Sequence, residues 1–163
     1  MTDARPDRVA RFVALRGIDA HVVSSGDAAP TAEAAARLLD VPFSSIVKTM
    51  VLTDGTRFVA AILPGNRRLD RSRAAAALGT GPLRFARPAD VLEQTGFPAG
   101  GVAPLGFAHE LAVVVDSSMS QNAVDGNVIA GGGREDSLIR VAVADLIRHN
   151  DARVAPICQD ELP

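Results

Sequence analysis

Two aliphatic runs joined by an Asp-Gly turn constrain the fold of this chain more than any other feature. The runs occupy residues 46–52 and 57–63, and Asp54 and Gly55 lie at the centre of the turn between them. Short Asp-Gly turns join antiparallel strands, because their backbone twist matches that of the paired strands. The sequence therefore predicts an antiparallel hairpin here, which argues against a purely parallel, doubly wound sheet.

Helical and strand patterns alternate along the rest of the chain, with Pro and Gly near most of their ends. We expect helices at residues 7–16, 32–39, 70–78, 88–95 and 143–149, and further strands at residues 21–23, 83–86, 111–115, 128–130 and 138–141. The tail from residue 151 onward is left unassigned. Interleaved helices and hairpins predict a mixed α/β fold.

Composition is consistent with one cytoplasmic domain that spans residues 1–163. The chain is 47% hydrophobic, which is enough for a substantial core. We expect no leader and no membrane span, because no apolar run approaches the required length of about 20 residues. Cys158 is the sole cysteine, so an internal disulfide is excluded and an unreactive thiol is expected.

Net charge and histidine spacing exclude further classes of protein. A formal charge of −2 argues against broad binding to nucleic-acid backbones, and we expect no DNA partner. Four arginines cluster near the start of one expected helix, where they contact phosphates or only solvate its surface. They are Arg67, Arg68, Arg71 and Arg73. His21, His109 and His149 are too scattered for a metal motif, so we expect neither metal nor cofactor.

Lys48 is the only lysine beside sixteen arginines. Strand alternation predicts that it shares a face with Ile46, Met50 and Leu52. Lysine is a compact cation whose pKa falls when it is desolvated, whereas arginine is a planar group that stays charged. We therefore interpret Lys48 as a pocket residue. The alternative is that it extends from a strand end to solvent and that codon usage explains its rarity.

Glycine and proline are concentrated in residues 96–106, which hold four glycines and two prolines. Glycine admits a ligand close to the backbone, and the N–H groups of such a loop can converge on a carbonyl or an oxyanion. A rigid turn is the alternative. The run Gly131-Gly132-Gly133-Arg134 lacks the Gly-Lys-Ser/Thr ending of a phosphate loop and is interpreted as a tight turn.

Several short motifs, taken in order, resemble the YbaK family of prolyl-tRNA-synthetase-associated, or aminoacyl-tRNA deacylase, domains over about residues 20–150. They are Thr31-Ala32-Glu33-Ala34-Ala35, Ile46-Val47-Lys48-Thr49, Leu63-Pro64-Gly65-Asn66-Arg67-Arg68-Leu69-Asp70, Gly100-Gly101-Val102-Ala103-Pro104-Leu105-Gly106 and Ala144-Asp145-Leu146. The resemblance implies a curved, largely antiparallel central sheet flanked by helices. It also implies hydrolysis of the ester between a wrong amino acid and tRNA, usually tRNA(Pro), in trans to the synthetase. The implied partners are the acceptor end of aminoacyl-tRNA and prolyl-tRNA synthetase, without a membrane.

By the same resemblance, Lys48 matches the functionally essential lysine of the family. The matching substrate-binding positions are Thr49, Gly100, Gly101, Val102, Ala103, Pro104, His21, Asp136 and Ser137. The chain departs from relatives in having no tyrosine, which several of them place near residues 21–23. It also has Leu138 where relatives that edit cysteine often carry aspartate. The amino acid that is edited, and the tRNA, are therefore left open.

Three functional hypotheses remain open. In the first, Lys48 binds the terminal phosphate or ester end of a mischarged tRNA, and N–H groups of residues 100–104 hold the carbonyl in the same pocket. In the second, the chain is a catalytically weak module that binds an aminoacyl or nucleotide-like ligand. In the third, Lys48 forms a Schiff base with a small carbonyl substrate.

Overall fold

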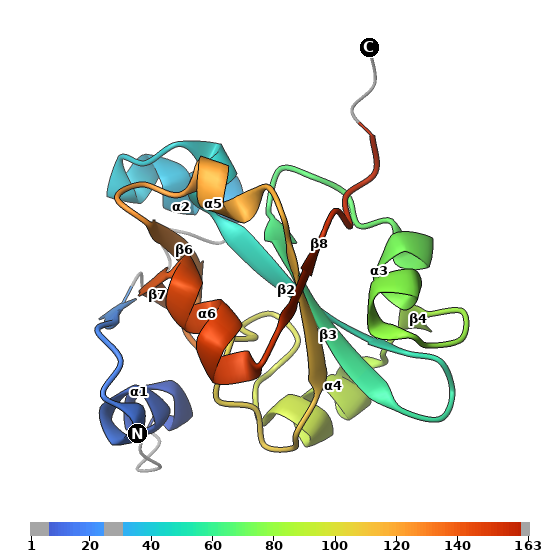
Figure 1. The fold of residues 1–163 in the computed structure, drawn as a ribbon. Helices are drawn as coiled ribbons and strands as arrows, with labels where there is room; N and C mark the ends of the chain where they lie inside the picture. The colour runs from blue at the N-terminus through green and yellow to red at the C-terminus, as the bar shows by residue number, and fades with distance from the viewer. Residues whose placement is uncertain (1–6, 25–30, 161–163) are drawn as a thin grey trace.

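The structure, a computed structural model, describes residues 7–24 and 31–160 (Figure 1). Its helices are α1 (Arg8–Arg16), α2 (Ala32–Leu39), the 3₁₀ helix η2 (Phe43–Ser45), α3 (Arg71–Leu78), α4 (Pro88–Thr95), α5 (Met119–Asn122) and α6 (Val143–Asn150). Its strands are β1 (His21–Ser24), β2 (Val47–Thr53), β3 (Phe58–Pro64), β4 (Arg84–Phe85), β5 (Ala112–Asp116), β6 (Asn127–Gly131), β7 (Ser137–Ala142) and β8 (Arg153–Ala155).

The described strands form two sheets, ordered β1-β7-β6 and β4-β2-β3-β5-β8. The predicted hairpin is confirmed, since β2 and β3 pair antiparallel from Val47 opposite Pro64 to Thr53 opposite Phe58. The mixed α/β class is confirmed as well. Within the larger sheet, β3 pairs with β5 and β5 pairs with β8 in parallel, so this sheet combines both directions.

The larger sheet separates two apolar cores. Val47 and Val51 project from β2 into one core, which also contains residues of α1, α4, α6, the smaller sheet and the loop before β5. Leu52 projects from the opposite face, where Met50 packs against the second core beneath α3. Figure 1 shows α3 and β4 on one side of the molecule, with α1, α2 and the smaller sheet at the other. Strand alternation therefore assigns each β2 side chain to one core or the other.

Local capping explains several of the predicted helix boundaries. Asp70 is the N-cap of α3, where its carboxylate accepts a 3.1 Å hydrogen bond from the Arg73 N–H. Gly79 ends the helix with a φ of 67°, a conformation that glycine adopts without strain. This helix contributes Arg71 to the pocket described below, so its N-cap also helps to fix the position of that arginine.

Two features differ from expectation. The tail that the sequence alone leaves unassigned contains β8. Its parallel pairing with β5 has no counterpart in the local sequence pattern. Ile46 precedes β2 and packs with Ala35, Ala36 and Ile129 in a small cluster below α2, so it does not share the environment of Met50 and Leu52. In the part of the chain that the structure describes, no helix is long and apolar enough to cross a membrane.

Candidate functional site

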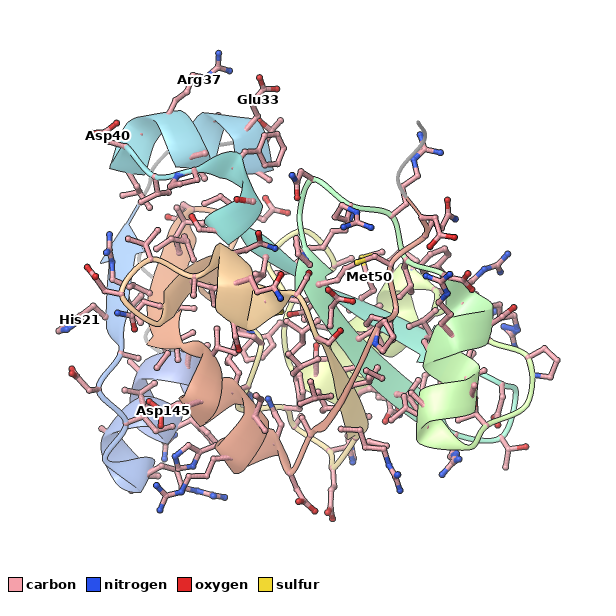
Figure 2. The ribbon with its side chains drawn as sticks, turned by 45° about the horizontal axis from the view of Figure 1, so that its top comes forward. His21, Glu33, Arg37, Asp40, Met50 and Asp145 are labelled. Carbon is pink, nitrogen blue, oxygen red and sulfur yellow. The ribbon has the colours of Figure 1, made fainter. Side chains whose placement is uncertain are left out.

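Lys48 lies on the face of β2 that carries Met50 and Leu52, directly opposite Leu63 of β3. Its side chain is half-buried and lines a cavity of about 310 Å³, at the lower end of the range of about 300–1,000 Å³ for ligand sites. We call this cavity the Lys48 pocket. Its lining residues are Lys48, Met50, Arg68, Leu69, Arg71, Phe85 and Gln159. Figure 2 shows Met50 on the side of the molecule that carries α3.

Burial lowers the pKa of Lys48 below its ordinary value. The neighbouring Cys158 acts in the opposite direction, and the positive charge of Arg68 lowers the pKa further. A cation that is partly stripped of water and faces other cations gains more from an anion than an exposed lysine does. The electrostatics of the pocket therefore favour a phosphate or carboxylate ligand.

Arginine and phenylalanine form the outer wall of the pocket. Arg71 donates a 3.3 Å hydrogen bond to the carbonyl of Leu83, and its guanidinium lies 5.7 Å from the centre of the Phe85 ring. These two contacts hold Arg71 in the lining of the pocket, beside the short strand β4. Phe85 is 49% exposed, so one part of its ring surface remains available for a ligand.

Cys158 lies close to Lys48 but is held as a thiol. Burial raises the pKa of Cys158 to about 11, assisted by the negative charge of Asp116 and by the hydrogen bond that the thiol donates to it. Burial also acts to raise the pKa of Asp116, but hydrogen bonds from Ser118, the Ile157 N–H and Cys158 outweigh it and leave this pKa below its usual value. The expectation of an unreactive thiol agrees with this environment.

The loop of residues 100–104 lies on the other face of the larger sheet. Val102 and Ala103 are buried in the core that contains Val47 and Val51, and the loop is absent from the lining of the Lys48 pocket. The loop and Lys48, which the sequence predicts in one pocket, therefore do not line this cavity together. The reason is the register of β2, because adjacent strand residues project from opposite faces and the loop packs on the face opposite to Lys48.

The loop instead interlocks with the turn between β6 and β7. A Cβ atom on Gly101 would lie 2.6 Å from the backbone carbon of Arg134, and one on Gly131 would lie 2.6 Å from the carbonyl oxygen of Val102. Both glycines are thus needed for close approach of two backbones. This contact accounts for Gly101 and Gly131 without a ligand.

The remaining predicted residues lie on the loop side of β2 or on the smaller sheet. Thr49 and Ser137 each have a buried hydroxyl oxygen without a hydrogen-bond partner among the described residues. Asp136 contacts Arg134, with 3.3 Å between Oδ1 and Nε. His21 points outward from β1, far from Met50 in Figure 2, and pairs with Asp19 at 3.4 Å. Substrate binding by these residues and by residues 100–104 stays a prediction.

Sequence reasoning missed Arg68, Phe85 and Gln159 as neighbours of Lys48. The arginine cluster is visible in the sequence, but only the folded chain shows that Arg68 and Arg71 lie in the same pocket as Lys48. Gln159 lies in the unassigned tail and reaches the pocket only through β8. Among residues 7–24 and 31–160, no group of three His, Cys, Asp or Glu side chains could hold a metal ion.

Comparison with known proteins places this chain among editing domains of translation. Its sequence is 34% identical over 106 residues to a proline–tRNA ligase of Thermosipho africanus, covering 65% of this chain but 18% of the enzyme. It is 29% identical over 132 residues to an uncharacterized Bacillus subtilis protein, YwhH, covering 80% of this chain and 82% of that protein. The chain thus corresponds to a small part of the ligase.

Solved structures agree in fold. A crystal structure of a candidate trans-editing enzyme for prolyl-tRNA synthetase is 30% identical, with a TM-score of 0.87, and the likeness covers 97% of this chain and 100% of that one. The profile of the aminoacyl-tRNA editing domain matches residues 27–149, which is most of the chain. The chain therefore belongs to the aminoacyl-tRNA editing domain family.

Proposed function

We propose that this protein is a trans-editing hydrolase that deacylates mischarged aminoacyl-tRNA. The similarity to proline–tRNA ligases and to a trans-editing structure supports tRNA(Pro) charged with a small non-cognate amino acid as the substrate. Prolyl-tRNA synthetase is the corresponding partner. The observation that carries the proposal is the Lys48 pocket, which places a partly desolvated cation between Arg68 and an apolar floor.

In this proposal Lys48 binds a phosphate of the acceptor end. The ammonium is a compact donor that can take one phosphate oxygen, and Arg68 and Arg71 supply further positive charge at the rim. Binding there would fix the terminal nucleotide, and fixation alone lowers the barrier for a reaction within the bound complex. Lys48 thus acts by positioning the substrate and not as a nucleophile.

The chemical step is ester hydrolysis. A water molecule attacks the carbonyl carbon of the aminoacyl ester, the bond from that carbon to the ribose oxygen breaks, and the proton of the water passes to the ribose oxygen. The products are free amino acid and tRNA with its terminal hydroxyl restored. Such an ester is already activated, so a protein nucleophile is not required.

The decisive experiment is a deacylation screen. tRNA(Pro) charged with alanine, cysteine or serine would be incubated with the protein, and correctly charged prolyl-tRNA(Pro) would serve as the control. We expect at least one mischarged species to lose its amino acid much faster than in buffer, while prolyl-tRNA(Pro) stays intact. A protein that deacylates none of them would contradict the proposal.

Two other outcomes correspond to the alternative hypotheses. The absence of tyrosine, which several relatives carry, favours a binding module, and such a module would bind the acceptor end without releasing the amino acid. A Schiff-base enzyme would be trapped covalently at Lys48 by borohydride in the presence of a carbonyl substrate. Because the pocket pairs Lys48 with arginines, we favour phosphate binding over Schiff-base chemistry.

A further inference from the structure

The C-terminal segment, residues 153–160, contributes Gln159 to the wall of the Lys48 pocket, although the segment lies beyond the part of the chain that matches the editing-domain profile. β8 adds the segment to the edge of the larger sheet beside β5. The chain then continues to Cys158, whose backbone forms an isolated antiparallel β-bridge with Leu69, and to Gln159, which lines the pocket. The pocket is therefore completed by one residue, Gln159, that the family match does not cover.

Backbone hydrogen bonds hold this wall against the segment that carries the arginines. The Asp70 N–H donates to the carbonyl of Ile157 at 2.7 Å, and the Gln159 N–H donates to the carbonyl of Arg68 at 2.8 Å. The side-chain amide of Gln159 also donates to the carbonyl of Leu69 at 3.3 Å. Both the backbone and the side chain of Gln159 are thus tied to residues that line the same pocket.

Asp116 anchors the wall from inside the protein. It is only 3% exposed, and its Oδ1 atom accepts a 2.9 Å hydrogen bond from the Ile157 N–H. Its Oδ2 atom accepts a 3.1 Å hydrogen bond from the Ser118 N–H. Asp116 does not line the pocket, so its effect on a ligand passes through Ile157 and the residues that follow.

The chemistry of the wall suits a nucleobase. Besides the N–H that it donates to Leu69, the Gln159 carboxamide has a carbonyl oxygen and a second N–H, and this pair can bind the edge of adenine. Met50 and the exposed ring of Phe85 offer apolar and aromatic surface for the face of a base. Phosphate-binding cations, an aromatic ring and an amide in one cavity are the parts of a nucleotide site.

We propose that Gln159 contacts the base of the terminal adenosine of the acceptor end and that Asp116 is its positioning residue. This inference rests on the proposed function, because it takes the acceptor end as the ligand. It adds a specificity-determining residue that lies outside the region shared with the family profile. Lys48 and Gln159 would then hold the phosphate and the base of one nucleotide.

Trinucleotide binding tests the base contact without the ester. The protein would be titrated with the ribonucleotides CCA and CCC, which carry equal charge. We expect the wild type to bind CCA about tenfold more tightly, the range of a good amide–adenine pair, and Gln159→Ala to bind the two about equally. Gln121→Ala makes the same chemical change at an exposed position on α5 and should retain the preference.

The outcomes separate this inference from the proposed activity. A wild type that deacylates nothing but shows a preference for CCA that Gln159→Ala abolishes would end the proposed activity and support the base contact. A preference unchanged in Gln159→Ala, or a wild type that does not distinguish CCA from CCC, would overturn the inference. If deacylation is found, Gln159→Ala should raise KM several-fold and leave kcat nearly unchanged, since the contact binds the base and does not touch the reacting carbonyl.

Asp116→Asn tests the positioning role. Asparagine preserves the volume and one acceptor but removes the charge that holds Ser118 and Ile157. We expect this variant to lose most of the CCA preference while inorganic phosphate, which needs only Lys48 and the arginines, binds as in the wild type. Loss of folding would weaken the binding of CCA and of inorganic phosphate equally. Either that equal loss or an unchanged CCA preference would refute the positioning role.

Discussion

Lys48 pairs with Leu63 across the β2–β3 ladder, and Leu63 is fully buried whereas Lys48 is half-buried at the rim. The pair places the ammonium at the edge of an apolar core, where it gains a lowered pKa without being sealed from a ligand. This position differs from that of a lysine that extends into solvent, and it governs the first two predictions.

Substitution of Lys48 should separate chemistry from stability. Lys48→Ala should abolish deacylation and leave the thermal midpoint within a few degrees of the wild type. The change removes the ammonium that binds the phosphate, but it also removes the free-energy cost of burying that ammonium. Lys48→Arg should be strongly impaired although it keeps the charge, since a planar guanidinium does not fit a site for a compact ammonium. Deacylation rates and thermal melts would be measured together. Near-normal turnover by Lys48→Arg would mean that only diffuse positive charge is needed.

The lowered pKa of Lys48 predicts an early loss of anion binding at alkaline pH. The ammonium loses its proton below the ordinary value of 10.5, so CCA affinity should begin to fall at a lower pH than for an exposed lysine. Binding is the better measurement, since aminoacyl esters hydrolyse spontaneously in alkali. Lys48→Met supplies the control, and its weaker binding should stay flat over the same pH range. A wild-type profile equally flat to pH 10.5 would contradict this prediction.

The raised pKa of Cys158 leads us to expect a second effect of alkaline pH, on folding stability and not on anion binding. Its pKa is raised from 9.0 to about 11, so between these values the folded protein keeps a proton that the unfolded chain has lost. Stability should therefore fall as pH rises through this window, relative to Cys158→Ser, which can keep the hydrogen bond to Asp116. Urea denaturation at pH 8, 9, 10 and 11 would measure the difference. A constant difference between the two proteins would show that the thiol is not held protonated.

Gly131→Ala should destabilise the protein because the new Cβ would meet the carbonyl oxygen of Val102 at 2.6 Å. Overpacking of this kind typically costs about 1–3 kcal/mol, or about 2–4 °C of thermal midpoint per kcal/mol in a protein of this size. Gly81→Ala is the matched control, since its nearest neighbour would lie at 3.8 Å. Equal midpoints for the two variants would mean that the loop and the turn do not interlock.

Salt dependence should reveal a small electrostatic footprint. The net charge of −2 leaves no excess of positive charge for a long duplex, so we expect contacts to two to four phosphates of the acceptor end. Each phosphate contributes about −0.7 on single strands and about −0.9 on duplex to the slope of log affinity against log salt. Affinity for tRNA measured at several salt concentrations should therefore change gently. A slope of about −8 would indicate a broad basic surface instead.

Local sequence signals were sufficient to predict most helices and strands of the fold. They were not sufficient to predict how distant strands pair. Asp70 begins α3 and Gly79 ends it, and Asp54-Gly55 forms the hairpin turn. The sequence predicts both because caps and turns depend on neighbouring residues alone. The parallel pairing of β5 with β8 depends on distant segments and left no trace in the tail. The residues of the site divide in the same way, into those that local sequence identifies and those that distant strand pairing brings in. Lys48 stood out by its rarity and strand position, whereas Gln159 became its neighbour only through that distant pairing.

The central position of β3 also has a kinetic consequence. Its parallel partner β5 begins the ladder with Ala112 opposite Val59, 53 positions further along the chain, whereas its hairpin partner β2 immediately precedes β3 and is joined to it by a short turn. Contacts between distant segments form slowly because a long loop must close before they are rewarded. The hairpin should therefore form early with apolar side chains on both of its faces still exposed. During that interval the nascent domain is most exposed to aggregation, and the arrival of β5 ends it.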